Sequence, residues 1–162
     1  MIVTLLLDDE AQQRFDRLRA EHFPPERNHL AAHVTLFHAL PGERLDAVRA
    51  DLAAAARRPP FAVAVTGVRF LGRGVAYDLA SAGLDRLRAG LADAWSPWLT
   101  PQDRQRHRAH VTVQNKVAPE VARALHERLS ASFASGAGTA RGLGLWRYLD
   151  GPWGAVDAFP FD

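Results

Sequence analysis

The stretch HVTLF (residues 33–37) has a counterpart in HVTVQ (residues 110–114), which repeats its pattern 77 residues later. Successive side chains of a β-strand point to opposite faces of the sheet. His33 and Thr35 therefore share one face, as do His110 and Thr112, while the apolar residues between them face a core. A polar stripe on a buried strand is costly unless it lines a wet groove. We therefore expect both pairs to line a cleft.

Around these strands, the two halves of the chain repeat an order of helix, H-x-T strand, helix and hairpin. The first half has a strand over 2–7, helices over 10–22 and 43–58, and a hairpin of 61–71 with 75–80. The second half has helices over 83–99 and from 119 onward, and a hairpin around DGPW (150–153). A doubly wound parallel sheet is the alternative, but both halves end in antiparallel-looking hairpins.

The predicted fold class is therefore α+β, in a single domain over residues 1–162. We expect a bilobal pseudo-two-fold repeat, one half-chain per lobe, with a boundary near residues 80–84. Two antiparallel-rich sheets would then flank a central cleft.

Composition limits the possible functions. The chain has no cysteine, which excludes disulfides, thiolate nucleophiles and cysteine-based metal sites. A formal net charge of +2 with a sequence pI of about 9.6 mildly favours an anionic partner, although a solvated arginine-rich surface fits equally well. The first segment, MIVTLLLDDE, has no basic leader and no cleavage site. We expect a cytoplasmic monomer without a membrane segment.

Two imidazoles that face one bound group suit general acid–base chemistry, because one can be neutral and the other charged near pH 7. The hydroxyls of Thr35 and Thr112 can bind the non-bridging oxygens of an anion, and the stripe continues to Gln114 and Lys116. In-line cleavage of a phosphodiester fits this set and needs no metal. Phe37, on the first strand, is the candidate for stacking on a base.

Other interpretations of the histidines carry less weight. A single histidine on an apolar strand is usually a satisfied core residue, but the matched pairs with threonine favour function. No H-E-x-x-H or D-x-D motif is present, so we expect neither a catalytic metal nor a cofactor. We assign surface or capping roles to the remaining histidines His22, His29, His107 and His126. The tryptophans are expected in the core. Trp146 or Tyr148 would border the cleft if the last hairpin closes it.

The two H-x-T motifs resemble those of the 2H phosphoesterase superfamily, and within it the bacterial 2′-5′ RNA ligase-like (LigT-like) proteins. The resemblance implies a bilobal fold and metal-independent opening of 2′,3′-cyclic phosphates, with reversible 2′-5′ ligation in some members. It also implies that His33 and His110 are catalytic and that Thr35 and Thr112 hold the phosphate. This chain departs from the family form at His38, where an aromatic residue is common, and at Lys116, near which an arginine often follows.

The substrate that we expect is RNA with a 2′,3′-cyclic phosphate end, or a small cyclic nucleotide. Which histidine is the base and which the acid depends on the ribose oxygen that leaves, and stays open. A non-catalytic RNA-end or nucleotide-binding module that uses the same cleft is the rival hypothesis. Specificity would reside in the loops at 24–30, 72–74 and 100–108.

Overall fold

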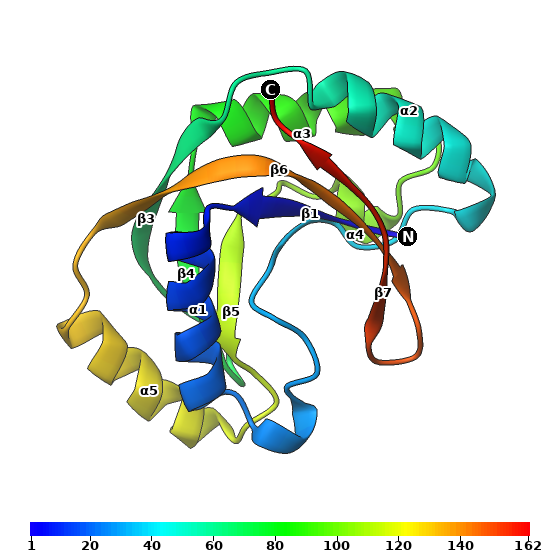
Figure 1. The fold of residues 1–162 in the computed structure, drawn as a ribbon. Helices are drawn as coiled ribbons and strands as arrows, with labels where there is room; N and C mark the ends of the chain where they lie inside the picture. Colours follow the sequence, from blue (N-terminus) through cyan, green and yellow to red (C-terminus); the bar gives the residue numbers. More distant parts are fainter.

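A computed structural model describes residues 1–162 of the chain (Figure 1). It confirms the α+β class. The elements, in order, are β1 (Ile2–Leu7), α1 (Asp9–His22), η1 (Pro25–Arg27), β2 (Val34–Phe37), η2 (Gly42–Arg44), α2 (Leu45–Ala55), β3 (Phe61–Phe70), β4 (Val75–Ala80), α3 (Ala82–Ala94), α4 (Pro101–Arg104), β5 (His110–Gln114), α5 (Pro119–Ala131), β6 (Gly136–Tyr148) and β7 (Trp153–Pro160).

The strands form one seven-stranded sheet, in the order β2-β1-β6-β3-β4-β5, with β7 paired to β6. All pairs are antiparallel. The expectation of two separate sheets is therefore wrong. The reason is the length of β6: its first part pairs with β3, its later part pairs with β7 along the same edge, and β1 occupies the opposite edge. β6 thus joins β1 and β2 on one side to β3, β4 and β5 on the other, and this division does not follow the two halves of the chain.

The first residues of β6 have a composition that does not predict a strand. The segment around Gly136 and Gly138 is glycine-rich, which is typical of a loop, yet it pairs with β3. A Cβ atom at Gly138 would lie 2.8 Å from the Cβ of Ala11 on α1. Glycine at this position therefore allows the helix to pack closely against the strand.

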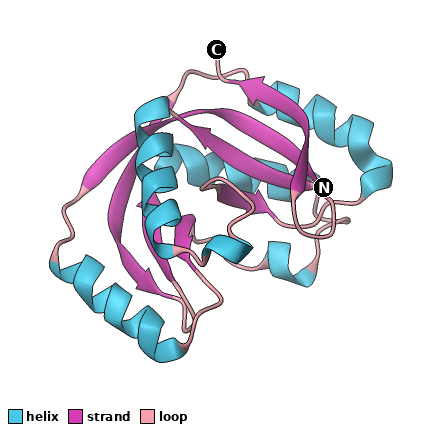
Figure 2. Ribbon diagram, turned by 60° about the horizontal axis from the view of Figure 1, so that its bottom comes forward, coloured by secondary structure: helices cyan, strands magenta, loops and turns pink.

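The sheet is curved, and its two end strands, β2 and β5, contact each other. Helix α1 packs on β5 and β6, and α5 packs on β3 and β4, whereas α2 and α3 form a pair at the top of Figure 1. Figure 2 shows the same arrangement from below, with the helices around the sheet. The curvature brings the two H-x-T strands, which are far apart in sequence, to neighbouring positions.

The buried Arg19 of α1 helps to hold this arrangement. Its Nη1 donates a hydrogen bond to the main-chain oxygen of Thr112 on β5 (2.9 Å), and its Nε donates to the side chain of Asn28 and the main chain of Leu30. One guanidinium therefore links α1, the loop before β2 and the motif strand β5. A buried arginine is stable only with such partners.

The alternation predicted for both motif strands is confirmed. Val34 and Leu36 of β2 are fully buried, as are Val111 and Val113 of β5, and all four belong to the main hydrophobic core. The motif histidines and threonines between them are only partly buried. None of the helices has the length and apolar character needed to cross a membrane.

Candidate active site

The two motif histidines are held in the same way. Nδ1 of His33 lies 2.8 Å from the main-chain oxygen of Ala31, and Nδ1 of His110 lies 2.8 Å from that of Arg108. In both cases the partner is the carbonyl two residues earlier. A carbonyl oxygen can only accept a hydrogen bond, so Nδ1 carries the proton of the neutral ring. Each imidazole therefore has an unprotonated Nε2 available for a ligand.

A polar cavity of about 240 Å³ lies at the second motif. Its lining combines His110 with Thr35 of the first motif, so the structure brings the two motifs together. Almost all the other lining residues are polar, and several are basic: Leu36, His38, Arg69, Arg88, Gln102, Asp103, Gln105, Arg106, His107 and Arg108. This composition suits an anion.

His33 lines a second cavity of about 580 Å³, which has a more apolar wall. Trp146 and Trp153 of the last hairpin border it, and the ring of Trp153 lies 4.6 Å from that of His33. Trp146, one of the two residues expected to border the cleft if the last hairpin closes it, lines this cavity, whereas Trp153, expected in the core, covers His33 instead. Tyr148 lines a separate pocket together with His38.

The surroundings lower the pKa of both histidines below its usual value. For His33 the main cause is burial, to which the charges of Arg19, His110 and His38 add. For His110 the main cause is again burial, and the charge of Arg69 adds to it, while the carboxylate of Asp78 acts in the opposite direction. The charge of His110 therefore acts on the pKa of His33.

The motif threonines use their main-chain oxygens to hold neighbouring residues. The oxygen of Thr35 accepts a hydrogen bond from Nε2 of His107 (2.9 Å), and that of Thr112 accepts the one from Arg19. The side chain of Thr35 lines the polar cavity, whereas Thr112 lines neither of the two cavities. His107, interpreted from sequence as a surface or capping residue, instead lines the polar cavity, and burial lowers its pKa.

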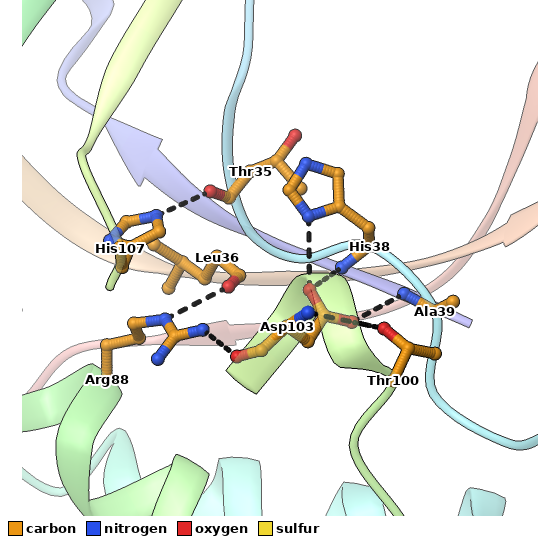
Figure 3. A network of polar contacts seen from close by, with 8 residues as sticks. All are labelled: Thr35, Leu36, His38, Ala39, Arg88, Thr100, Asp103 and His107. Atoms are coloured by element: carbon orange, nitrogen blue, oxygen red, sulfur yellow. Dashed lines mark hydrogen bonds and ion pairs between the residues drawn. The ribbon is translucent and has the colours of Figure 1, made fainter. Parts of the chain in front are cut away.

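A buried carboxylate organises the wall beside Thr35 (Figure 3). The side chain of Asp103 accepts hydrogen bonds from the amides of His38 (2.8 Å) and Ala39 (3.0 Å), and Nδ1 of His38 lies 3.1 Å from it. These bonds outweigh the effect of burial and lower the pKa of Asp103 to about 2. Arg88 then joins the main-chain oxygens of Asp103 and Leu36. Asp103 is therefore ionised at neutral pH.

Besides Thr112, three further predicted site residues do not line the two cavities. Phe37 is fully buried, with its ring against Trp95 (4.9 Å between centroids) and Arg88, so the prediction that it stacks on a base is wrong. The cause is that Arg88 of α3 and Trp95 at the end of this helix cover the side chain at the end of β2. Gln114 is buried, and Lys116 is an exposed residue with a φ of 62° beyond β5; neither lines the two cavities.

The sequence reasoning missed Asp103, Arg88 and Arg69. The only local signal was at Asp103: the segment TPQD (100–103) has a capping threonine followed by proline, which indicates a short helix. Nothing in the sequence indicated that this helix would meet the end of β2.

No group of three or more His, Asp or Glu side chains is placed to hold a metal ion.

Comparisons with known proteins identify the family and the fold. The family model of the 2′-5′ RNA ligase superfamily matches residues 7–152. Among solved structures, TT0787 of Thermus thermophilus is 17% identical with a TM-score of 0.68, and covers 99% of this chain and 98% of its own. E. coli LigT complexed with 3′-AMP is 18% identical with a TM-score of 0.62, and covers 99% and 96%.

E. coli LigT complexed with NADP⁺ has the same identity, with a TM-score of 0.59 over 99% of this chain and 96% of that one. A search of curated protein sequences gave no match. At these identities the solved structures show a shared fold, and the family model, which spans most of the chain, shows the family. The chain belongs to the 2′-5′ RNA ligase superfamily.

Proposed function

We propose that this chain is a metal-independent phosphodiesterase that opens 2′,3′-cyclic phosphates on RNA ends or small nucleotides. The observation that carries the proposal is the matched pair His33 and His110, each held through Nδ1 by a main-chain oxygen with Nε2 free. Membership of the 2′-5′ RNA ligase superfamily supports a phosphoesterase-like activity. Structures of E. coli LigT with 3′-AMP and with NADP⁺ support a nucleotide ligand.

The reaction requires one neutral and one protonated imidazole. Nε2 of the neutral ring accepts a proton from water while the water oxygen bonds to phosphorus. The bond from phosphorus to one ribose oxygen breaks, and Nε2–H of the charged ring protonates that oxygen. The product is a phosphomonoester beside a free hydroxyl. Attack by a ribose hydroxyl in place of water would give the corresponding ligation.

The threonines have the complementary role. As charge builds up on the non-bridging oxygens, the hydroxyls of Thr35 and Thr112 donate hydrogen bonds to them. The basic residues of the polar cavity, including Arg106 and Arg108, favour binding of the anion. The histidine whose proton reaches the leaving oxygen is identified by which phosphate isomer is formed.

The test is a product analysis by phosphorus NMR, with EDTA present, on an oligoribonucleotide that ends in a 2′,3′-cyclic phosphate. The wild-type chain should form a single monophosphate isomer. His33→Ala and His110→Ala should each lower the rate by about 10²-fold to 10⁴-fold, since each removes a proton-transfer group. The matched control is His126→Gln, which changes a histidine on α5 that bonds to the oxygen of Val68, and it should keep wild-type activity.

Two results would contradict the proposal. Metal-stripped protein that is inactive and recovers with Zn²⁺ or Mn²⁺ would exclude the metal-independent reaction. Binding of the RNA end without turnover, with weaker binding in both alanine variants, would instead support the non-catalytic module. Circular dichroism of every variant establishes that loss of activity does not reflect unfolding.

A further inference from the structure

The polar cavity contains an imidazole that the proposed reaction does not use. His38 follows β2 directly and lines the cavity with Thr35 and His110. Its side chain is 44% exposed.

The buried carboxylate of Asp103 fixes the orientation of this imidazole (Figure 3). Asp103 has only 1% of its side chain exposed and is ionised, so it can only accept a hydrogen bond. Nδ1 of His38, at 3.1 Å, must therefore carry a proton. The remaining ring nitrogen, Nε2, is on the opposite side of the ring and is available to a ligand.

A purely structural role does not account for the imidazole. Asp103 already anchors this segment through the main-chain amides of His38 and Ala39, and Arg88 links its main-chain oxygen to that of Leu36. These bonds need no particular side chain at position 38. The contact with Nδ1 therefore serves to aim the ring, as a carboxylate does for a functional histidine.

We propose that His38, oriented by Asp103, binds an anionic oxygen of the substrate phosphate and so adds a third imidazole to the two of the H-x-T motifs. The assignment of the phosphate as substrate rests on the proposed function. In the proposed complex both ring nitrogens of His38 carry a proton: Nε2–H donates to the anion, and Asp103 accepts from Nδ1–H and compensates the positive charge. Arg69, Arg106 and Arg108 of the same cavity add positive charge around the bound phosphate.

The experiment titrates inorganic phosphate into the full chain at neutral pH by isothermal titration calorimetry. His38→Phe keeps an aromatic ring but removes both ring nitrogens, and His38→Gln keeps an N–H donor without the charge. Loss of a charge-assisted hydrogen bond should raise the Kd for phosphate about ten-fold in His38→Phe and less in His38→Gln. His126→Gln serves as the histidine control and should leave the Kd unchanged.

A second measurement locates the phosphate. In protein labelled with ¹⁵N at histidine, phosphate should shift the Nε2 resonance of His38, which is assigned by its loss in His38→Phe. A Kd for His38→Phe within two-fold of wild type, or an Nε2 resonance that phosphate does not shift, would overturn the inference. Wild-type protein that binds no phosphate would do the same.

Neither measurement depends on turnover. A chain that binds phosphate through His38 but opens no cyclic phosphate would overturn the proposed reaction and support this inference. A chain that opens cyclic phosphates but has an unchanged Kd for phosphate in His38→Phe would support the proposed reaction and overturn this inference.

Discussion

At the residue scale, His33 and His110 share one main-chain arrangement but have different charged neighbours. The neighbours that act on His33 are cationic, whereas His110 also has the carboxylate of Asp78, its partner across β4 and β5. Asp78 is itself paired with Arg69. A change of Asp78 should therefore alter the pKa of His110 and not that of His33, which distinguishes the two imidazoles.

Asp78→Asn should move one limb of the pH profile and leave the other unchanged. The carboxylate stabilises protonated His110, so its removal lowers the pKa of His110 further, and the limb of kcat/KM that belongs to His110 moves to lower pH. Because burial lowers the pKa of both histidines from 6.5, we expect the wild-type maximum below that value. Initial rates from about pH 4 to about pH 8 give the profile.

Asp85→Asn is the matched control, because Asp85 lines a neighbouring cavity and does not act on the pKa of His110. A shift of the limb to higher pH in Asp78→Asn, or an equal shift in both variants, would contradict the assignment.

A second prediction at this scale concerns the stability that Asp103 provides. Its pKa falls from 3.8 to about 2 on folding, so its stabilising effect is complete above pH 3.8 and is lost as the pH falls toward 2. The difference corresponds to about 2 kcal/mol. Asp103→Asn should therefore lower the free energy of unfolding at neutral pH by about that amount, and the deficit should shrink at acid pH. Urea unfolding at several pH values measures it.

The exposed Asp93, whose change to Asn should have no effect at any pH, is the control for this measurement. A deficit in Asp103→Asn that stayed constant down to about pH 2 would assign it to packing instead of charge.

At the element scale, alternation predicted the motif strands because side-chain direction on a strand depends only on local geometry. The inward positions of β2 and β5, and the half-buried histidines and threonines, follow from it. The same rule failed at Phe37, because what a strand face meets depends on which helix covers it. The contacts of Asp103 and Trp153 likewise join elements distant in sequence, so no local pattern indicated them.

The hairpin of β6 and β7 supplies the next prediction, because Trp153 covers the imidazole of His33. Burial is the main cause of the lowered pKa of His33, so Trp153→Ala should raise that pKa toward its usual value. Proton NMR of the histidine ring signals as a function of pH measures this shift. Tyr148→Ala, in the same hairpin but more than half exposed, should leave the pKa of His33 unchanged.

If the pKa of His33 were the same in Trp153→Ala and wild type, the arginine and histidine charges would be its main determinant, and the contact with Trp153 would have no electrostatic role.

At the scale of the whole molecule, the site depends on strands from both halves of the chain. β6 pairs with β1 and β3 of the first half, and β4 of the first half pairs with β5. The positions of the two histidines are thus set by one continuous sheet. A boundary near residues 80–84 in the sequence pattern does not correspond to a break in hydrogen bonding.

Unfolding should consequently be a single cooperative step. All four tryptophans lie in the second half, at or after Trp95, whereas far-UV circular dichroism reports on helices and strands of both halves. Independent lobes would give separate urea transitions by the two probes, and one sheet gives coincident transitions. The separate fragments 1–81 and 82–162 should each lack cooperative unfolding, because each loses strand partners along β3, β4 or β6. Cooperative unfolding of either fragment alone would show that a half-chain is a folding unit, and that β6 joins two domains instead of completing one.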